Sequence, residues 1–397
     1  IRDSSVTGVQ TCALPILALR YSDVDEQFRA ELRAWLAAEL PALPPQPARD
    51  DWQARRAWDT DWQRRLFDAG YAGINWPEEY GGRGATPSQH LVFLEETTRA
   101  RAPYVGVNFV GLLHAGPTII AEGTDEQKRD HLPRILRGDE VWCQGFSEPQ
   151  AGSDLASLRT RAVRDGDHYV VTGQKIWCSF GQIGDFGELL VRTDPDAPKH
   201  QGITWLALPM DLPGIEVRPL RTVLGSSEFA ELFLDEVRVP VSCRIGEEND
   251  GWRVTNVTLS FERGTAFVSE MVDARRLVDD LAPYVTDPAY RRELGHLAAE
   301  LDGVWALTRR NVTQAARTGV MGPGAMMIKY AYSELRQRLG ELSMRILERD
   351  ALAVDVVGEF VEERLRTLAL TIAAGTSQIQ KNIIGERVLG LPKEPVR

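Results

Sequence analysis

The sequence predicts an α+β protein with three domains: an all-α N-terminal domain, a middle β domain of barrel or sandwich type, and a C-terminal four-helix bundle. Apolar residues recur at helical spacing up to about residue 140, short alternating segments with Asp-Gly and Pro-Gly punctuation follow, and long helical runs return after Gly251. A chain of 397 residues is also too long for a single core. We place the domains at 19–140, 141–245 and 246–397.

The N-terminal domain is predicted from its helical periodicity. In the run that starts at Asp25, Phe28, Leu32 and Leu36 fall on one face, and Pro41 ends the helix. Further helices are predicted over residues 52–69, 88–100, 105–120 and onward from 124. Residues 1–18 resemble a translated sequencing adapter, so we treat them as a non-native or disordered leader whose removal should cost no activity.

The middle and C-terminal domains differ in the spacing at which apolar residues recur. Alternation and turn residues predict strands over 158–163, 168–177, 188–192, 203–209, 215–218 and 231–239. The helical period then predicts long helices over 252–281, 290–318, 325–348 and 359–384. Helices of this length and number are typical of an antiparallel bundle.

Composition excludes several classes of function. The net charge is −11 and the basic residues are scattered, which argues against nucleic-acid binding. No window reaches the roughly 18 apolar residues of a membrane span. The 4 cysteines form no Cys-x-x-Cys pair and the 6 histidines no ligand-spaced cluster, so we expect no metal or disulfide framework and a cytoplasmic location.

Residues 143–181 are the most informative segment. Two short predicted strands carry hydroxyls at Ser147, Ser153 and Ser179, small residues at 151–152, and the indole of Trp177, with little charge. Such a surface suits a planar heterocycle, although an ordinary β-hairpin has the same composition. No Gly-x-Gly-x-x-Gly lies between a strand and a helix, so a Rossmann site has no support.

The order of residues in this segment carries a resemblance. FSEPQAGSD followed by GQKIWCS resembles the flavin-facing signature of the FAD-dependent acyl-CoA dehydrogenases, and WPEEYGGRGA, LDEVRVP and AAGTSQ extend the resemblance over about residues 22–397. The resemblance implies FAD as cofactor, held by Gln144, Phe146, Ser147, Ser153, Trp177, Cys178, Ser179, Thr376 and Gln378. It implies that acyl-CoA contacts Ser153, Ser260, Arg263 and Gly375, and that the acyl chain lies along 104–113, where Gly106 and Gly264 leave room.

The family's reaction needs a carboxylate that takes the α-proton while the β-hydrogen leaves as hydride to flavin N5. At the commonest family position for this base, before the Gly of the terminal Gly-Thr, this chain has Ala374. A bacterial subgroup places the base on the first helix of the C-terminal bundle, where LSFERGTAF supplies Glu262 beside Arg263. We predict Glu262 as the base and Glu270 as the fallback; the alternative for Glu262 is an ordinary solvated glutamate.

The resemblance also implies partners and leaves alternatives open. It implies a role in lipid metabolism and β-oxidation, an electron-transfer flavoprotein as acceptor, and either a homotetramer or an α2β2 heterotetramer with a paralogue. The leading prediction is dehydrogenation of an acyl-CoA to the 2-enoyl-CoA. The alternatives are a base-less structural partner subunit, or a flavin monooxygenase or oxidase on the same scaffold.

Overall fold

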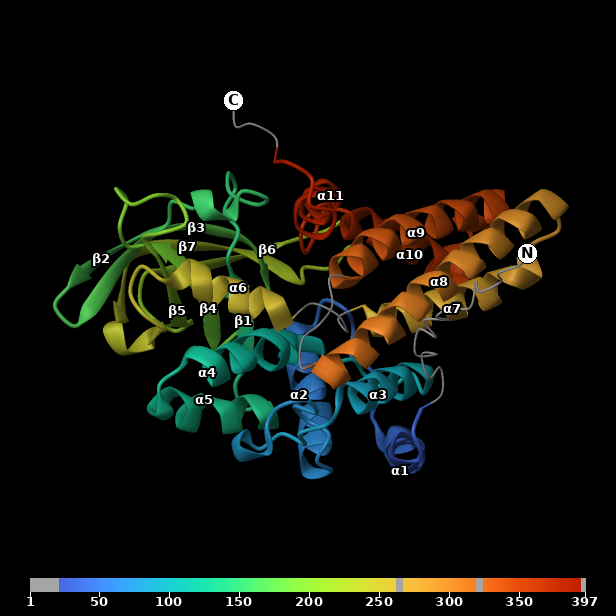
Figure 1. The fold of residues 1–397 in the computed structure, drawn as a ribbon, viewed down its shortest axis with the longest axis horizontal. Helices are drawn as coiled ribbons and strands as arrows, with labels where there is room; N and C mark the ends of the chain where they lie inside the picture. Colours follow the sequence, from blue (N-terminus) through green and yellow to red (C-terminus); the bar gives the residue numbers. More distant parts are fainter. Residues whose placement is uncertain (1–20, 262–266, 319–323, 394–397) are drawn as a thin grey trace, which may run out of the picture.

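The computed structural model describes residues 21–261, 267–318 and 324–393, and it describes their side chains except at 261, 325 and 354–356. A β domain lies beside a group of N-terminal helices, and a bundle of long helices extends away from both (Figure 1). The N-terminal helices are α1 (Asp23–Glu39), α2 (Trp52–Asp68), α3 (Pro87–Arg99), α4 (Gly116–Glu122) and α5 (Asp125–Arg137). The predicted fold class is confirmed.

Local capping explains where the N-terminal helices begin. Ser22 and Thr124 accept hydrogen bonds from backbone amides three residues on, at Asp25 and Gln127, and those side chains bond back to the cap. Phe28, Leu32 and Leu36 of α1 are buried, as their spacing predicts. The helix start at Thr124 is therefore confirmed down to its capping box.

The predicted helix over 105–120 is present, but it is irregular in its first half. A 3₁₀ turn covers Gly106–Asn108, a π-helical turn covers Gly111–Ala115, and only then does α4 begin. Asp59 holds the start of this segment, because its carboxylate accepts a hydrogen bond from the Val107 amide at 3.0 Å. A Cβ on Gly106 would lie 2.2 Å from Asp59 Oδ2. The Asp59 carboxylate therefore fills the space beside Gly106, and the expectation that Gly106 leaves room for an acyl chain is wrong.

One 8-stranded sheet forms the middle domain, in the order β6-β7-β3-β2-β4-β5-β8, with β1 paired to β4. The strands are β1 (Trp142–Gly145), β2 (Arg161–Asp165), β3 (His168–Ser179), β4 (Phe186–Arg192), β5 (Ile203–Pro209), β6 (Ile215–Leu220), β7 (Phe229–Pro240) and β8 (Arg244–Ile245). Both faces of β4 are buried: Leu189 and Val191 pack inside the β domain, whereas Leu190 packs toward the helices. This two-sided burial explains the apolar run of Leu189, Leu190 and Val191 within the strand.

The C-terminal helices are α6 (Gly251–Phe261), α7 (Val268–Leu281), α8 (Pro288–Thr318), α9 (Gly324–Leu347), α10 (Val354–Leu370) and α11 (Ser377–Ile383). The predicted helix over 252–281 is two helices, because Phe267 has non-helical φ and ψ of −104° and 12°. The predicted helix over 359–384 is likewise interrupted, by a turn in which Ala374 and Gly375 have φ of 50° and 81°. α7, α8, α9 and α10 form the bundle (Figure 1).

Candidate active site

The signature segment folds into a small platform that joins the end of β1 to β3. The Ile176 amide donates to the Ser147 carbonyl at 2.9 Å, which holds the loop after β1 against β3. Glu148 and Ala151 then close a tight turn through paired backbone hydrogen bonds. Gly152 and Ser153 are exposed beyond that turn, and no atom lies within 4 Å of a Cβ built on Gly152. A ligand can therefore approach the backbone here closely.

A buried ion pair holds the platform in place. Lys175 on β3 is fully buried, and its Nζ contacts Glu148 Oε1 at 3.0 Å and donates to the Phe146 carbonyl at 3.1 Å. Glu148 also accepts from the amides of Arg159 and Thr160 at 2.7 and 2.8 Å. Burial acts to raise the pKa of Glu148, but Lys175 and the amides outweigh it and hold that pKa below its usual value. Burial in turn lowers the pKa of Lys175, partly offset by Glu148.

Trp177 forms an open aromatic wall beside the platform. The register of β3 against β7 shifts between Lys175 and Cys178, and Trp177 in that bulge has a φ of 61° and an exposed fraction of 56%. Its ring meets Phe229 edge-on, with centroids 5.8 Å apart. A bulge re-aims a side chain, and here it turns an indole outward where a planar ring can stack on it.

The residues after Trp177 divide between core and surface. Cys178 is fully buried, and burial raises the pKa of its thiol, so only its backbone can face a ligand. Ser179, half-buried, pairs with Phe229 of β7. The platform thus offers hydroxyls at Ser147 and Ser179, free-standing backbone at 152–153, and one indole, which fits an isoalloxazine ring.

Gln144 sits deeper, under the platform. Its Nε2 lies 3.0 Å from His114 Nδ1 and 3.3 Å from Glu188 Oε2. His114 and Glu188 are themselves buried. The amide of Gln144 is therefore oriented by a buried polar cluster, and the side chain of Phe146 is buried as well, so any contact of Phe146 with a ligand would be through its backbone.

The C-terminal segment expected at the cofactor is arranged as a helix start. Thr376 caps α11 by accepting from the Ile379 amide at 3.2 Å, and Gln378 is exposed. The Gly375 carbonyl accepts from Lys329 Nζ at 2.7 Å, and burial lowers the pKa of Lys329 to about 8. Ala374 is exposed and its methyl group accepts no proton. Thr376 therefore caps α11 and Gln378 is open to solvent, and contact of either residue with the cofactor stays a prediction.

The predicted base and its neighbour, Glu262 and Arg263, lie outside the described residues, as does Gly264. Ser260, on the last turn of α6, is exposed and donates from Oγ to the Val257 carbonyl at 2.7 Å. The fallback, Glu270, lies in the first turns of α7, and burial raises the pKa of its carboxyl to about 7.

Sequence reasoning missed the parts that hold the platform. Lys175 belongs to the motif that carried the resemblance, but a lysine is rarely expected to be fully buried, and its partner Glu148 lies 27 residues earlier. Within residues 21–261, 267–318 and 324–393, no group of His, Cys, Asp or Glu could hold a metal ion, and no helix is long and apolar enough to cross a membrane.

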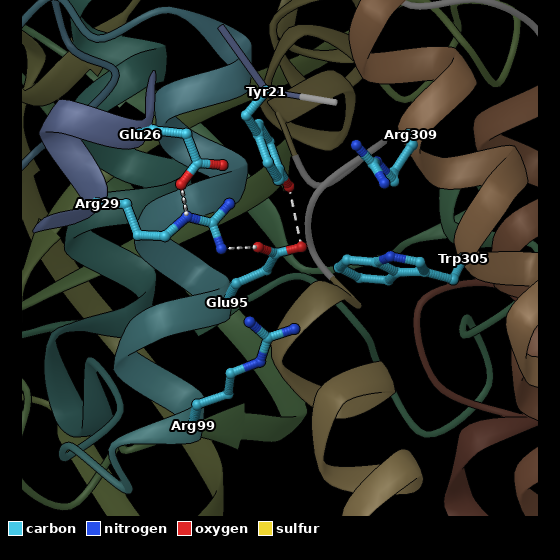
Figure 2. A pocket seen from close by; sticks show the side chains of 7 residues that line it. All are labelled: Tyr21, Glu26, Arg29, Glu95, Arg99, Trp305 and Arg309. Atoms are coloured by element: carbon cyan, nitrogen blue, oxygen red, sulfur yellow. Dashed lines mark hydrogen bonds and ion pairs between the residues drawn. The ribbon is translucent and has the colours of Figure 1, made fainter. Parts of the chain in front are cut away.

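A separate open cavity of about 440 Å³ lies between α1, α3 and α8, where Figure 2 shows Tyr21 between the guanidinium groups of Arg29 and Arg309. The Tyr21 hydroxyl donates to Glu95 at 2.9 Å, and Arg29 pairs with the other oxygen of Glu95 at 3.3 Å. The guanidinium carbons lie 4.4 and 4.9 Å from the ring centroid. These contacts form a joint between the N-terminal helices and the bundle, away from the platform.

Comparison with known proteins decides the family. Models of the acyl-CoA dehydrogenase N-terminal, middle and C-terminal domains match residues 22–139, 143–237 and 249–389. The chain belongs to the acyl-CoA dehydrogenase family. The dehydrogenase is similar to acyl-CoA dehydrogenase IpdE1 of Mycobacterium tuberculosis, with 38% identity over 93% of this chain and 98% of that protein.

Solved structures support the same family. The dehydrogenase superposes on a chain of the ChsE4-ChsE5 complex from Mycobacterium tuberculosis with a TM-score of 0.82 and 33% identity, covering 95% of this chain and 100% of that one. It also superposes on the Tcur3481-Tcur3483 steroid ACAD with a TM-score of 0.82 and 31% identity, covering 94% and 99%. The protein is therefore an oxidoreductase that dehydrogenates acyl-CoA thioesters, as the motifs predicted.

Proposed function

We propose that this dehydrogenase binds FAD against the platform of residues 144–153 and 177–179, and that Glu262 takes the α-proton of the acyl-CoA. The observation that carries the proposal is the exposed, outward-turned indole of Trp177 beside a rigidly held, nearly uncharged stretch of backbone. FAD, when bound there, supplies the acceptor for the β-hydrogen, which leaves as hydride. The other step, removal of the α-proton, is carried out by a side chain of this protein, Glu262.

Each residue has a distinct part in the proposal. Trp177 covers one side of the ring, the hydroxyls of Ser147 and Ser179 hydrogen-bond to its polar edge, and Gln144 presents an amide already oriented by His114. Gln378 and the backbone near Ser153 contact the rest of the cofactor and the CoA portion. Since Ala374 accepts no proton, the base must be a carboxylate elsewhere, and Glu262 precedes an arginine that can position substrate by a charge-assisted contact.

We further propose that the working enzyme contains a paralogous subunit and accepts ring-bearing acyl groups. Two solved structures similar to this chain bear paired names, ChsE4-ChsE5 and Tcur3481-Tcur3483, and the second is described as a steroid ACAD. An α2β2 tetramer is therefore favoured over a homotetramer. An electron-transfer flavoprotein is the proposed acceptor, and the cytoplasm the proposed location.

Anaerobic mixing of the flavin-loaded protein with straight-chain, branched and steroid-like acyl-CoA thioesters tests the proposal. The expected result is loss of the oxidised-flavin absorbance and a product lighter by two hydrogens, fastest with a ring-bearing thioester. Readmitted air should restore the flavin slowly. Fast reoxidation with a hydroxylated product would instead identify a monooxygenase, and an unchanged flavin with every thioester would identify a non-catalytic subunit.

A further inference from the structure

The turn between α10 and α11 is exposed and has a strained backbone. Residues 372–375 are exposed, and Ala374 and Gly375 have positive φ, of 50° and 81°. A side chain in this left-handed region costs free energy, so Ala374 keeps the conformation only where neighbouring contacts hold the backbone. Gln380 of α11 supplies one such contact, donating from Nε2 to the Ala374 carbonyl at 3.2 Å. The Gly375 carbonyl depends on a donor from another element.

Lys329 of α9 lies beneath this turn and supplies that donor. The residue is buried, with an exposed fraction of 5%, and its Nζ donates to the Leu370 and Gly375 carbonyls at 2.9 and 2.7 Å. Leu370 is the last residue of α10, where a helix leaves carbonyls without partners and where its dipole favours a cation. One ammonium group therefore caps α10 and holds the far end of the turn.

The two ends of the turn are fixed independently of Lys329. The Ser377 amide donates to the Thr371 carbonyl at 2.9 Å and closes the turn. Gln337 of α9 donates to the Thr371 hydroxyl at 2.8 Å, and Ser377 donates from Oγ to Glu334 of α9 at 2.7 Å. Removal of the Lys329 ammonium would therefore release the middle of the turn without detaching α11 from the bundle.

We propose that Lys329 is a positioning residue that sets the conformation of residues 374–378 and thereby the affinity of the protein for FAD. This inference rests on the proposed function, in which Gln378 contacts the cofactor. Lys329 acts through the backbone, because its bond to the Gly375 carbonyl fixes the chain just before Thr376 and Gln378. A small displacement of this segment moves the groups that meet the cofactor.

The protonation state of Lys329 should control this hold. The ammonium group makes charge-assisted bonds to the two carbonyls, whereas the neutral amine makes weaker ones. Burial lowers the pKa of Lys329 to about 8, and Glu334, on the same helix, acts in the opposite direction. Residues 367–376 carry no ionisable side chain, and Lys381 of α11 lies over the Tyr330 ring at 5.1 Å. Loss of the Lys329 proton near pH 8 should therefore loosen the turn.

Release of FAD from the full chain tests the inference. The flavin-loaded protein is diluted, and the rise in flavin fluorescence gives the FAD dissociation constant on either side of the Lys329 pKa of about 8, from about pH 7 to about pH 9. Lys329→Met removes the donors and leaves a side chain of similar length. Lys381→Met is the matched control, since Lys381 is an exposed lysine of α11 and its loss changes the net charge equally. Amide hydrogen exchange over 371–378 reports whether the turn itself has loosened.

At about pH 7, Lys329→Met should bind FAD roughly tenfold more weakly than wild type and exchange its amides over 371–378 faster, because two charge-assisted bonds are lost. The dissociation constants of wild type and Lys381→Met should rise roughly three- to tenfold by about pH 9, as Lys329 loses its proton. That of Lys329→Met should stay level over the same range.

Dissociation constants of wild type and Lys329→Met that agree within about twofold would overturn the inference. Weaker binding without faster exchange over 371–378 would overturn it too. If Lys329→Met fails to fold, the wild-type pH profile decides, since a level profile from about pH 7 to about pH 9 overturns the inference by itself. A wild type that binds no FAD would overturn the proposed function, and this inference with it.

Discussion

Replacement of Lys175 by methionine should unfold the flavin platform before any other part of the site. Lys175 is fully buried and is the only described cation within ion-pair distance of Glu148, at 3.0 Å. The substitution leaves the Glu148 carboxylate buried with donors from two backbone amides and the Gln150 side-chain amide but no counter-charge. Breaking a buried pair from one side costs about 3–5 kcal/mol. That is a large fraction of the roughly 5–15 kcal/mol by which a domain is stable.

Urea unfolding followed by tryptophan fluorescence measures this loss, because Trp142, Trp177 and Trp205 all lie in the β domain. Lys199→Met is the matched control, since Lys199 is exposed and pairs only with the exposed Asp154, a contact worth about 0–1 kcal/mol. The double variant Lys175→Met/Glu148→Gln should recover part of the loss, because it removes the stranded charge. A Lys175→Met protein within about 1 kcal/mol of wild type would refute the reasoning, because buried pairs cost more than that.

Three further substitutions each test a different interaction. Trp177→Ala should weaken FAD binding by roughly two- to tenfold while changing stability by less than about 0.5 kcal/mol, since the indole is 56% exposed; an unchanged FAD dissociation constant would contradict the stacking assignment. Tyr21→Phe should cost about 1–2 kcal/mol by leaving Glu95 short of a donor, and a melting temperature equal to wild type would exclude the joint in Figure 2 as a stabilising element. Wild type should lose on the order of 3 kcal/mol of stability between about pH 4.5 and about pH 7, because the raised pKa of Glu270 stabilises the fold only while the carboxyl is protonated. Glu270→Gln has no such carboxyl, so its free energy of unfolding minus that of wild type should rise by the same amount over this range. A difference that stays constant with pH would show that this carboxyl keeps its ordinary pKa in the fold.

Much of the fold could be predicted because its signals are local. The Ser22 and Thr124 caps, the apolar face of α1 and the Asp165-Gly166 turn between β2 and β3 are each visible within a few residues. The 3₁₀ turn at 106–108 could not be predicted from the helical period, since it is held by Asp59 of a different helix. A helical period alone also cannot show that Phe267 leaves the helical conformation between α6 and α7.

Some features of the candidate site could likewise be predicted from the sequence, and others could not. The exposed Trp177 and the small residues at 151–153 follow from motif and composition, whereas the burial of Cys178 and the use of Thr376 as a cap depend on the register of β3 and on the start of α11. The Lys175–Glu148 pair and the contact of Gln144 with His114 each join residues far apart in sequence. No periodicity within one segment contains that information.

Anaerobic reduction of the flavin by acyl-CoA, compared between Glu262→Gln and Glu270→Gln, tests the central claim most directly. The account predicts that Glu262→Gln binds substrate but leaves the flavin oxidised, a loss of about 10²–10⁴ in rate typical of a missing base. Glu270→Gln should still reduce the flavin. Reduction by Glu262→Gln at the wild-type rate would contradict the account, and its loss in Glu270→Gln alone would move the base to α7.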